Sequence, residues 1–301
     1  MSDIVTGRGD SKLLLLSNDA MRARRRPRAI LWLWGFKAAL SLSVAWPAAR
    51  AIGTAYGAHP SGDAALFADG GYAMLEWLSR ETATRGALTA LFAAVTAVGI
   101  AFGVLPLVAA IAAIAHATPE GRAPRARQLV AIVAECAWPA LGLLGLATLA
   151  EAACGALAYG ISEWSHDWLT GHFGEVRGEQ TLVAIFAIIA CLAAIVGVVH
   201  DLARAALVRF RKGVAQALAV GVTAFRARPA ALVWAWAWRS LAGLSLIALG
   251  AIASTRLGGR PGSTLVALAC LHQLVALATV AMRASWLARA LRAADASGST
   301  L

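Results

Sequence analysis

Five ionisable side chains lie within, or at the edge of, long stretches of apolar residues: Lys37, Glu135, Asp201, Arg239 and His272. If those stretches cross a bilayer, a charge near the bilayer centre costs roughly 2.5–3.5 kcal/mol and needs a partner. Lys37, Glu135 and Arg239 each lie within about ten residues of the start of an apolar stretch, which places them at similar depths. We therefore predict that the five residues form an intramembrane polar cluster in which Glu135 pairs with Lys37 or Arg239.

Each member of this cluster also has alternative interpretations. Lys37 and Arg239 have long side chains that can reach back to the lipid headgroups. The shorter Glu135 either links helices or lines a solute pathway. His272, which precedes Gln273, either hydrogen-bonds a neighbouring helix or relays protons. The sequence leaves these alternatives open.

Motifs for catalysis or metal binding are weak. Residues 160–163 have the G-x-S-x form of rhomboid-type intramembrane serine proteases, but Ser162 ends an apolar stretch and His272 lies deeper in another. No H-E-x-x-H, Walker A or N-P-A motif is present. We expect no catalytic, metal-binding or cofactor-binding residues, and no enzymatic activity. We also expect free thiols, because no C-x-x-C pair is formed by the four cysteines, Cys136, Cys154, Cys191 and Cys270.

The composition defines the environment of these residues. The 301-residue chain is 59% hydrophobic and 14% charged, whereas soluble domains have about 45–50% apolar and about 25% charged residues. Residues 87–117, 181–199 and 263–282 contain no Asp, Glu, Lys or Arg. Apolar runs of about 18 or more residues are typical of membrane spans. We therefore predict an all-α, polytopic membrane helix bundle.

About six spans are expected, arranged as three consecutive hairpins in a single transmembrane domain over residues 29–292. A basic tail, 1–28, precedes this domain and a short tail, 293–301, follows it. Within it, residues 163–180 are predicted to form an acidic loop. Another polar segment, 58–86, is predicted to hold a short surface helix with Leu66, Phe67, Met74, Leu75 and Leu78 on one face. The predicted spans are 29–53, 87–116, 129–159, 181–200, 230–254 and 263–284, with an amphipathic cytoplasmic helix at 213–227.

The distribution of basic residues predicts the orientation. The net charge is +11, and such a charge can indicate nucleic-acid binding. Here the charge is spread over short connections, so we expect no nucleic-acid partner. If both termini are cytoplasmic, the cytoplasmic segments hold 19 basic residues and the outer segments hold 5. This excess is what the positive-inside rule predicts for an N-in, C-in protein.

An internal repeat relates two of the spans at a constant offset of 202 residues. The segment that starts at Arg26 reads R-P-R-A-I-L-W-L-W-G-F-K, and the one that starts at Arg228 reads R-P-A-A-L-V-W-A-W-A-W-R. Pro27 matches Pro229, and Lys37 matches Arg239. A proline at the first helical position needs no N–H partner, so each segment is expected to begin a helix. A third copy near Glu135 is much weaker.

The second half of the chain resembles a known type of membrane protein. The residues that carry this resemblance are His200 to Arg204, Phe225 to Pro229 and the tryptophan-rich span that follows. Over residues 185–290 the chain resembles bacterial six-span proteins without assigned activity, and it is similar to the membrane domain attached to glycerophosphodiesterases. That resemblance implies a plain membrane module with no catalytic residues.

These observations favour a non-enzymatic protein of the bacterial inner membrane, either a scaffold or a partner subunit. The alternative is a small-solute transporter or permease subunit with the polar cluster on its pathway. The expected partners are the lipid bilayer, with anionic headgroups at the cytoplasmic face, and a second protein or a second copy of this chain.

Overall fold

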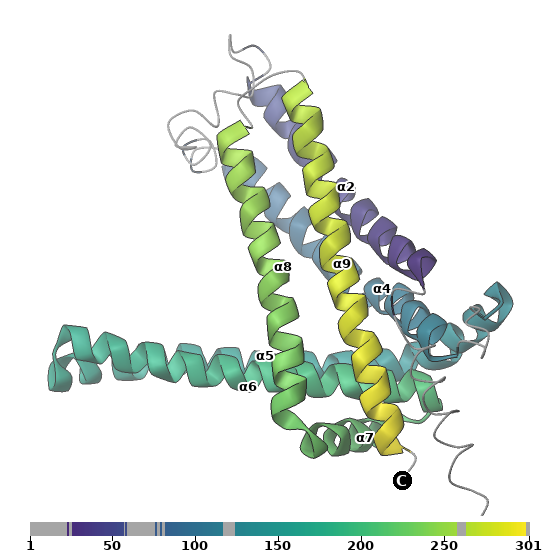
Figure 1. Ribbon diagram of the computed structural model, residues 1–301. Helices are drawn as coiled ribbons and strands as arrows, with labels where there is room; N and C mark the ends of the chain where they lie inside the picture. The colour runs from purple at the N-terminus through teal and green to yellow at the C-terminus, as the bar shows by residue number, and fades with distance from the viewer. Residues whose placement is uncertain are drawn as a thin grey trace, which may run out of the picture. The chain divides into compact units, whose positions relative to one another are not determined.

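The computed structural model describes residues 26–56, 82–116, 124–257 and 263–298, together with Ala23, Ala58, Glu76 and Ser79. The described part is helical throughout and contains no strand. Six of its helices are long and apolar enough to cross a membrane, which confirms the predicted fold class. The helices in Figure 1 are α2 (Pro27–Tyr56), α4 (Thr82–Ala115), α5 (Ala126–Phe173), α6 (Glu175–Phe210), α7 (Val214–Ala227), α8 (Pro229–Leu257) and α9 (Ser263–Gly298).

The prediction of an acidic loop at residues 163–180 is wrong. Helix α5 continues to Phe173 and α6 starts at Glu175, so only Gly174 interrupts the two helices. Gly174 has a φ of 77°, a conformation that costs glycine little and other residues more. Acidic side chains face water as well from a helix as from a loop, so acidity alone was no sign of irregular structure. The predicted surface-helix residues Leu66, Phe67, Met74, Leu75 and Leu78 lie outside the described residues.

The two repeat segments begin their helices at the predicted positions. Pro27 is the first residue of α2, and Pro229 is the first residue of α8. Both helices then run for a similar length, 30 and 29 residues. The amphipathic helix expected at 213–227 is α7, which starts one residue later.

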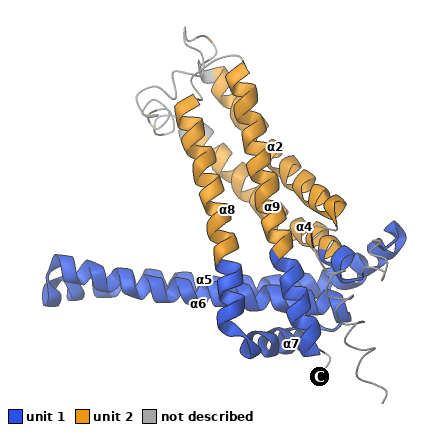
Figure 2. Ribbon diagram, viewed as in Figure 1, with its two compact units in different colours: residues 1–22, 111–237, 286–301 blue, residues 23–110, 238–285 orange. Residues whose placement is uncertain are grey.

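The chain folds into two compact units, coloured separately in Figure 2. Unit 1 includes residues 111–237 and 286–301, so it holds α5, α6 and α7 with the ends of α4 and α9 and the start of α8. Unit 2 includes residues 23–110 and 238–285, so it holds α2, most of α4 and the remaining parts of α8 and α9.

In unit 1, α5 and α6 pack side by side as an antiparallel hairpin, and α7 packs on α6. The hairpin closes tightly at its turn, where a Cβ added to Gly178 would lie 2.9 Å from the backbone of Thr170. Helix α7 buries residues at the i, i+3, i+4 and i+7 positions of one face, as an amphipathic helix should. These residues are Ala217, Val220, Gly221 and Ala224.

In unit 2, the buried cluster consists of Leu33 from α2, Ala110 from α4 and Val280 from α9. Helices α8 and α9 meet along small and polar residues. A Cβ on Gly243 would lie 3.8 Å from the Thr279 side chain, and one on Gly250 would lie 3.5 Å from His272. Small residues at such contacts let membrane helices approach closely.

Large apolar side chains are exposed along the spans of both units. In water, apolar surface on this scale would drive association, whereas a bilayer solvates it. The exposed set includes Leu42, Phe92, Trp138, Leu149, Val183, Ile188, Leu244, Ile252 and Leu274. Lipid contact is therefore the environment that this surface fits.

The packing of α7 on α6 gives a first prediction. In Gly221→Ala, the new Cβ would lie 2.8 Å from the backbone nitrogen of Ala203, so the two helices must separate. We expect the variant to lose about 1–3 kcal/mol of stability, measured by thermal unfolding in detergent. In the control Gly155→Ala, no atom lies within 4 Å of the new Cβ, so stability should stay the same or rise by up to ~1 kcal/mol. Equal effects of the two substitutions would contradict the close contact.

Candidate functional site

Among the residues that the structure describes, the longest continuous buried stretch lies near the C-terminal end of α6. Eight consecutive residues, 201–208, are buried. A helix buries consecutive residues only where other elements cover every side of it, because successive side chains point about 100° apart. We call residues 198–211, with the side chains that contact them, the α6 hub.

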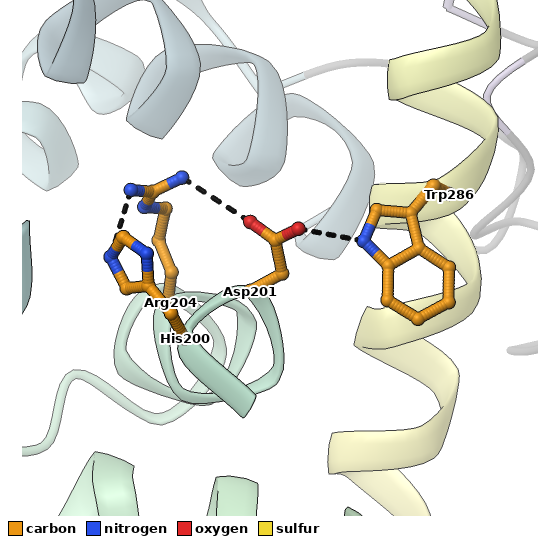
Figure 3. Close-up of polar contacts among 4 residues, drawn as sticks. All are labelled: His200, Asp201, Arg204 and Trp286. Atoms are coloured by element: carbon orange, nitrogen blue, oxygen red, sulfur yellow. Dashed lines mark hydrogen bonds and ion pairs between the residues drawn. The ribbon is translucent and has the colours of Figure 1, made fainter. Parts of the chain in front are cut away.

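A buried carboxylate joins α6 to α9 at the centre of the α6 hub. The indole Nε1 of Trp286 donates a hydrogen bond to Oδ2 of Asp201 at 2.8 Å. Arg204, one turn along α6, contacts the other oxygen, Oδ1, at 3.4 Å. Figure 3 shows Asp201 held between the two side chains. Asp201 and Trp286 are each only 1% exposed and Arg204 is 4% exposed, so solvent screens the ion pair little.

His200 completes this group from the neighbouring position of α6. Its Nε2 lies 2.9 Å from Nη2 of Arg204, as Figure 3 also shows. A guanidinium group can only donate hydrogen bonds. His200 therefore accepts through Nε2, and this contact requires the neutral ring with its proton on Nδ1.

The ends of α4 and α6 cap one another. Arg209 of α6 donates from Nη1 to the carbonyl oxygen of Ala115, the last residue of α4, at 2.7 Å. His116, the next residue, lies with its Nε2 3.0 Å from the carbonyl oxygen of Val208 near the end of α6. A carbonyl only accepts, so His116 donates from Nε2. Each helix thus supplies a donor for the last-turn carbonyls of the other, which have no partner within their own helix.

Asp295 ties the end of α9 to this pair of helix ends. Its Oδ1 accepts a hydrogen bond from Nε of Arg209 at 2.7 Å. Arg209 therefore links α4, α6 and α9 with one side chain. The fork of a guanidinium group suits it to such a position, because its donors point in several fixed directions.

His116 lies in a positive and partly buried setting just after the span of α4. Burial lowers the pKa of His116 below its usual value. Its hydrogen bond to the Val208 carbonyl raises that pKa, whereas the charges of Arg209 and Arg211 lower it further. The net effect favours the neutral ring.

Glu135 belongs to the edge of the α6 hub. Its Oε2 lies 3.3 Å from Nη1 of Arg211, and both side chains are about half exposed. Exposed ion pairs are worth about 0–1 kcal/mol, so this contact adds little stability. The predicted partners Lys37 and Arg239 belong to unit 2, and their pairing with Glu135 stays a prediction.

The other three members of the predicted cluster lie in unit 2. Arg239 donates from Nε to Oγ of Ser285 at 3.3 Å, across the α8–α9 contact. His272 hydrogen-bonds the neighbouring helix, with its Nε2 2.8 Å from Oγ of Ser254. Lys37 lies within electrostatic range of Arg283. Units 1 and 2 thus divide the predicted cluster into Asp201 with Glu135 and Lys37 with Arg239 and His272.

The α6 hub contains a buried polar network centred on Asp201. Both oxygens of Asp201 accept from side chains, and the carboxylate is buried. Within the described ranges, no group of three or more His, Cys, Asp and Glu residues is placed to hold a metal ion. All four cysteines are free thiols. The arrangement therefore joins helices α4, α6 and α9.

The sequence identified Asp201 as a candidate site residue but did not identify the other polar residues of the α6 hub. These residues are Trp286, Arg209, His116 and Asp295. The i, i+3 and i+4 spacing of Asp201 and Arg204 with His200 was a readable local signal. The contacts to Trp286 and Asp295 span more than 80 residues of chain, and no local pattern marks them.

Comparisons with known proteins supply no relative. A scan of family models found no match, and searches of the curated proteins and of the solved structures found none either.

The Asp201 network gives a second prediction. Trp286→Phe keeps the aromatic packing but removes the donor to a buried carboxylate, so it should cost about 1.5–3 kcal/mol of stability. Asp201→Asn leaves Arg204 buried without its counter-charge and should cost about 3–5 kcal/mol. Thermal and denaturant unfolding in detergent measure both. The control is Trp164→Phe, because Trp164 is 90% exposed and should change stability by less than about 0.5 kcal/mol. A Trp286→Phe protein as stable as this control would refute the network's role.

His116 gives a third prediction, on pH. Because its pKa is lowered in the folded protein, the unfolded chain binds the proton more readily. The free energy of unfolding should therefore be constant above the unfolded pKa of about 6.5 and fall as pH drops from there toward the folded pKa. His116→Gln should weaken this fall between pH 7.5 and 5.5. The exposed His172 supplies the control variant, His172→Gln, which should keep the wild-type profile.

Proposed function

We propose that this chain is a non-enzymatic, multi-pass protein of the bacterial inner membrane that serves as a scaffold or partner subunit. The observation that carries the proposal is the way the α6 hub uses its polar groups. Asp201, Arg209 and His116 bond to helix ends or to side chains of other helices, and Arg204 bonds to Asp201 and His200 within α6. Polar groups in a catalytic or transport site must instead leave a position open for substrate.

The α8–α9 contact supports the same interpretation. Ser254 and His272 are close enough for a nucleophile and its base. However, the Ser254 hydroxyl also lies 2.9 Å from the carbonyl oxygen of Gly250, which can only accept a proton. His272 also approaches that carbonyl oxygen, at 3.4 Å. With the hydroxyl proton directed to Gly250, His272 donates to the serine oxygen, and the pair acts as a link between helices.

The charges at the two ends of the α5–α6 hairpin support the N-in, C-in orientation. Residues 151–180, around Gly174, hold five acidic residues and one basic residue. Residues 122–135 and 201–228, around the other end, hold nine basic and two acidic residues. By the positive-inside rule, the α6 hub lies on the cytoplasmic side and Gly174 on the outer side.

The length of α5 supports a hub that projects beyond the lipid. Its 48 residues correspond to about 72 Å at about 1.5 Å per residue, whereas the hydrocarbon core is only about 30 Å thick. Basic side chains near the α6 hub, including Arg211, Lys212 and Arg226, then lie where anionic headgroups or a protein partner would meet them. The resemblance to the membrane domain attached to glycerophosphodiesterases supports the same kind of module.

The orientation and the function are tested separately, and together they form the fourth prediction. Green fluorescent protein fused after Lys212 should fluoresce, and alkaline phosphatase fused after Gly174 should be active in the periplasm. Cross-linking in intact cells should capture the chain in a stoichiometric complex with a second copy or another membrane protein. An active phosphatase after Lys212 would refute the orientation. A chain that purifies alone and conducts solutes in proteoliposomes, with flux lost in Glu135→Gln, would replace the scaffold by a permease.

A further inference from the structure

Gln273 lies at the middle of the charge-free stretch of α9. Residues 263–282 contain no Asp, Glu, Lys or Arg, and Gln273 follows Ser263, the first residue of α9, by ten positions. Ten residues of helix correspond to about 15 Å, which is half of the roughly 30 Å hydrocarbon core. The membrane location proposed above therefore puts this amide near the centre of the bilayer, where no water can hydrogen-bond to it.

The Gln273 side chain has no partner within the part of the chain that the structure describes. It is exposed, and no hydrogen bond joins its amide to another described residue. The preceding residue, His272, faces α8, where it contacts Ser254. Successive residues of a helix point about 100° apart, so Gln273 is turned away from that contact. An amide without a hydrogen bond is costly in hydrocarbon, so we expect its partner to come from beyond the described helices of unit 2.

The stripe of α9 that carries Gln273 is covered at one end and open at the other. Val280 and Val266 lie seven residues after and before Gln273, which is two turns along the same stripe. Val280 is fully buried in a cluster with Leu33 and Ala110, whereas Val266 is 65% exposed. Going from Val280 toward the N-terminus of α9, the stripe therefore emerges from the core of unit 2 before it reaches Gln273.

Small side chains surround Gln273 on the open part of this stripe. Residues three and four positions away are its neighbours on the helix surface, and they include Ala269, Cys270 and Ala276. Ala269 and Cys270 are exposed as Gln273 is. Small residues let the backbones of two membrane helices approach closely, so that polar side chains can bond between them. We call Val266, Ala269, Cys270 and Gln273 the Gln273 face.

The chemistry of the glutamine amide favours a second copy of this chain as the partner. The amide accepts through its carbonyl oxygen and donates through its NH2 group, so two glutamines can each donate to the other. Two copies of a membrane protein share one orientation in the bilayer, so identical residues lie at the same depth. A two-fold axis along the membrane normal then brings the two Gln273 side chains together. Two-fold dimers, in which the same surface meets itself, are the commonest oligomers.

We propose that the chain forms a two-fold symmetric dimer through the Gln273 face of α9, with reciprocal hydrogen bonds between the two Gln273 amides. The proposal rests on the membrane location and scaffold role proposed above, and it names a second copy as the partner in that role. Cys270 lies three residues before Gln273 on the same face, so the Cys270 thiols of the two copies lie close to the dimer axis.

The test, our fifth prediction, uses full-length chains in which Cys270 is the only cysteine left and the other three are replaced by alanine. Oxidation with copper phenanthroline in membranes should convert most of this protein to a disulfide-linked dimer. In the control Cys270→Ala/Leu271→Cys, the thiol moves by one residue to another exposed position. Leu271 points about 200° around the helix from Gln273, so this control should stay monomeric.

The role of the amide is tested by a substitution of similar size. Gln273→Met keeps the length of the side chain but removes its hydrogen-bonding groups. It should weaken dimer association about five- to thirtyfold, measured in proteoliposomes by energy transfer between labelled copies at increasing dilution in lipid. The matched control is Gln216→Met, which removes an exposed amide from α7, a helix of 14 residues that is too short to span the bilayer. This control should associate as wild type does.

Three results would overturn the proposal. The first is a Cys270 protein that stays monomeric under oxidation. The second is equal cross-linking of the Leu271→Cys control, which would indicate random collisions in the membrane. The third is a Gln273→Met protein that associates as tightly as wild type. If an amine-reactive cross-linker then captures a different membrane protein in a fixed ratio, the scaffold role stands without the dimer. A chain that carbonate extracts from the membrane would contradict the membrane location and the dimer together.

Discussion

The hydrogen-bonding requirement of the buried Asp201 carboxylate determines which helices of unit 1 pack together. A carboxylate that is 1% exposed must be fully hydrogen-bonded, because an unpaired buried charge costs several kcal/mol. Arg204 supplies one contact from the same helix, but the second oxygen needs a donor from elsewhere, and the Trp286 indole of α9 supplies it. Helix α9 is thereby fixed to α6, although Trp286 and Asp201 are separated by 85 positions in the sequence. The apolar packing of residues 202–208 can then form on all sides of the helix.

Small residues and helix-end capping make that packing possible. Ala203, Ala205 and Ala206 are fully buried, and the absence of a side chain at Gly221 lets α7 approach the backbone of Ala203. Close approach brings helix ends into a low-dielectric region, where free carbonyls are costly. Two side chains satisfy these carbonyls. Arg209 of α6 donates to a carbonyl at the end of α4, and His116, which follows α4, donates to a carbonyl near the end of α6. The polar contacts of the α6 hub are thus consequences of burying helix ends, and they need no substrate to explain them.

The local features of this fold could be predicted from sequence, and the pairings could not. Apolar runs identified six spans because lipid imposes a length and a composition on each helix independently. Pro27 and Pro229 marked helix starts because their effect is confined to one turn. The prediction of a loop at the acidic segment 163–180 was wrong. The chain reverses between α5 and α6 at the backbone of one residue, Gly174, and the surrounding charge does not determine where the helices end. The partners of Asp201 and Arg209 are set by tertiary packing across more than 80 residues, which a single sequence does not encode in any local pattern.

Charge pairing around the α6 hub follows from the same burial. Each described acidic residue near the α6 hub faces an arginine: Asp201 faces Arg204, Asp295 faces Arg209 and Glu135 faces Arg211. Asp201 and Arg204 are buried, whereas Glu135 and Arg211 are about half exposed. Solvent screens the exposed pair much more than the buried pair, so the ion pair at Asp201 has the larger effect on stability.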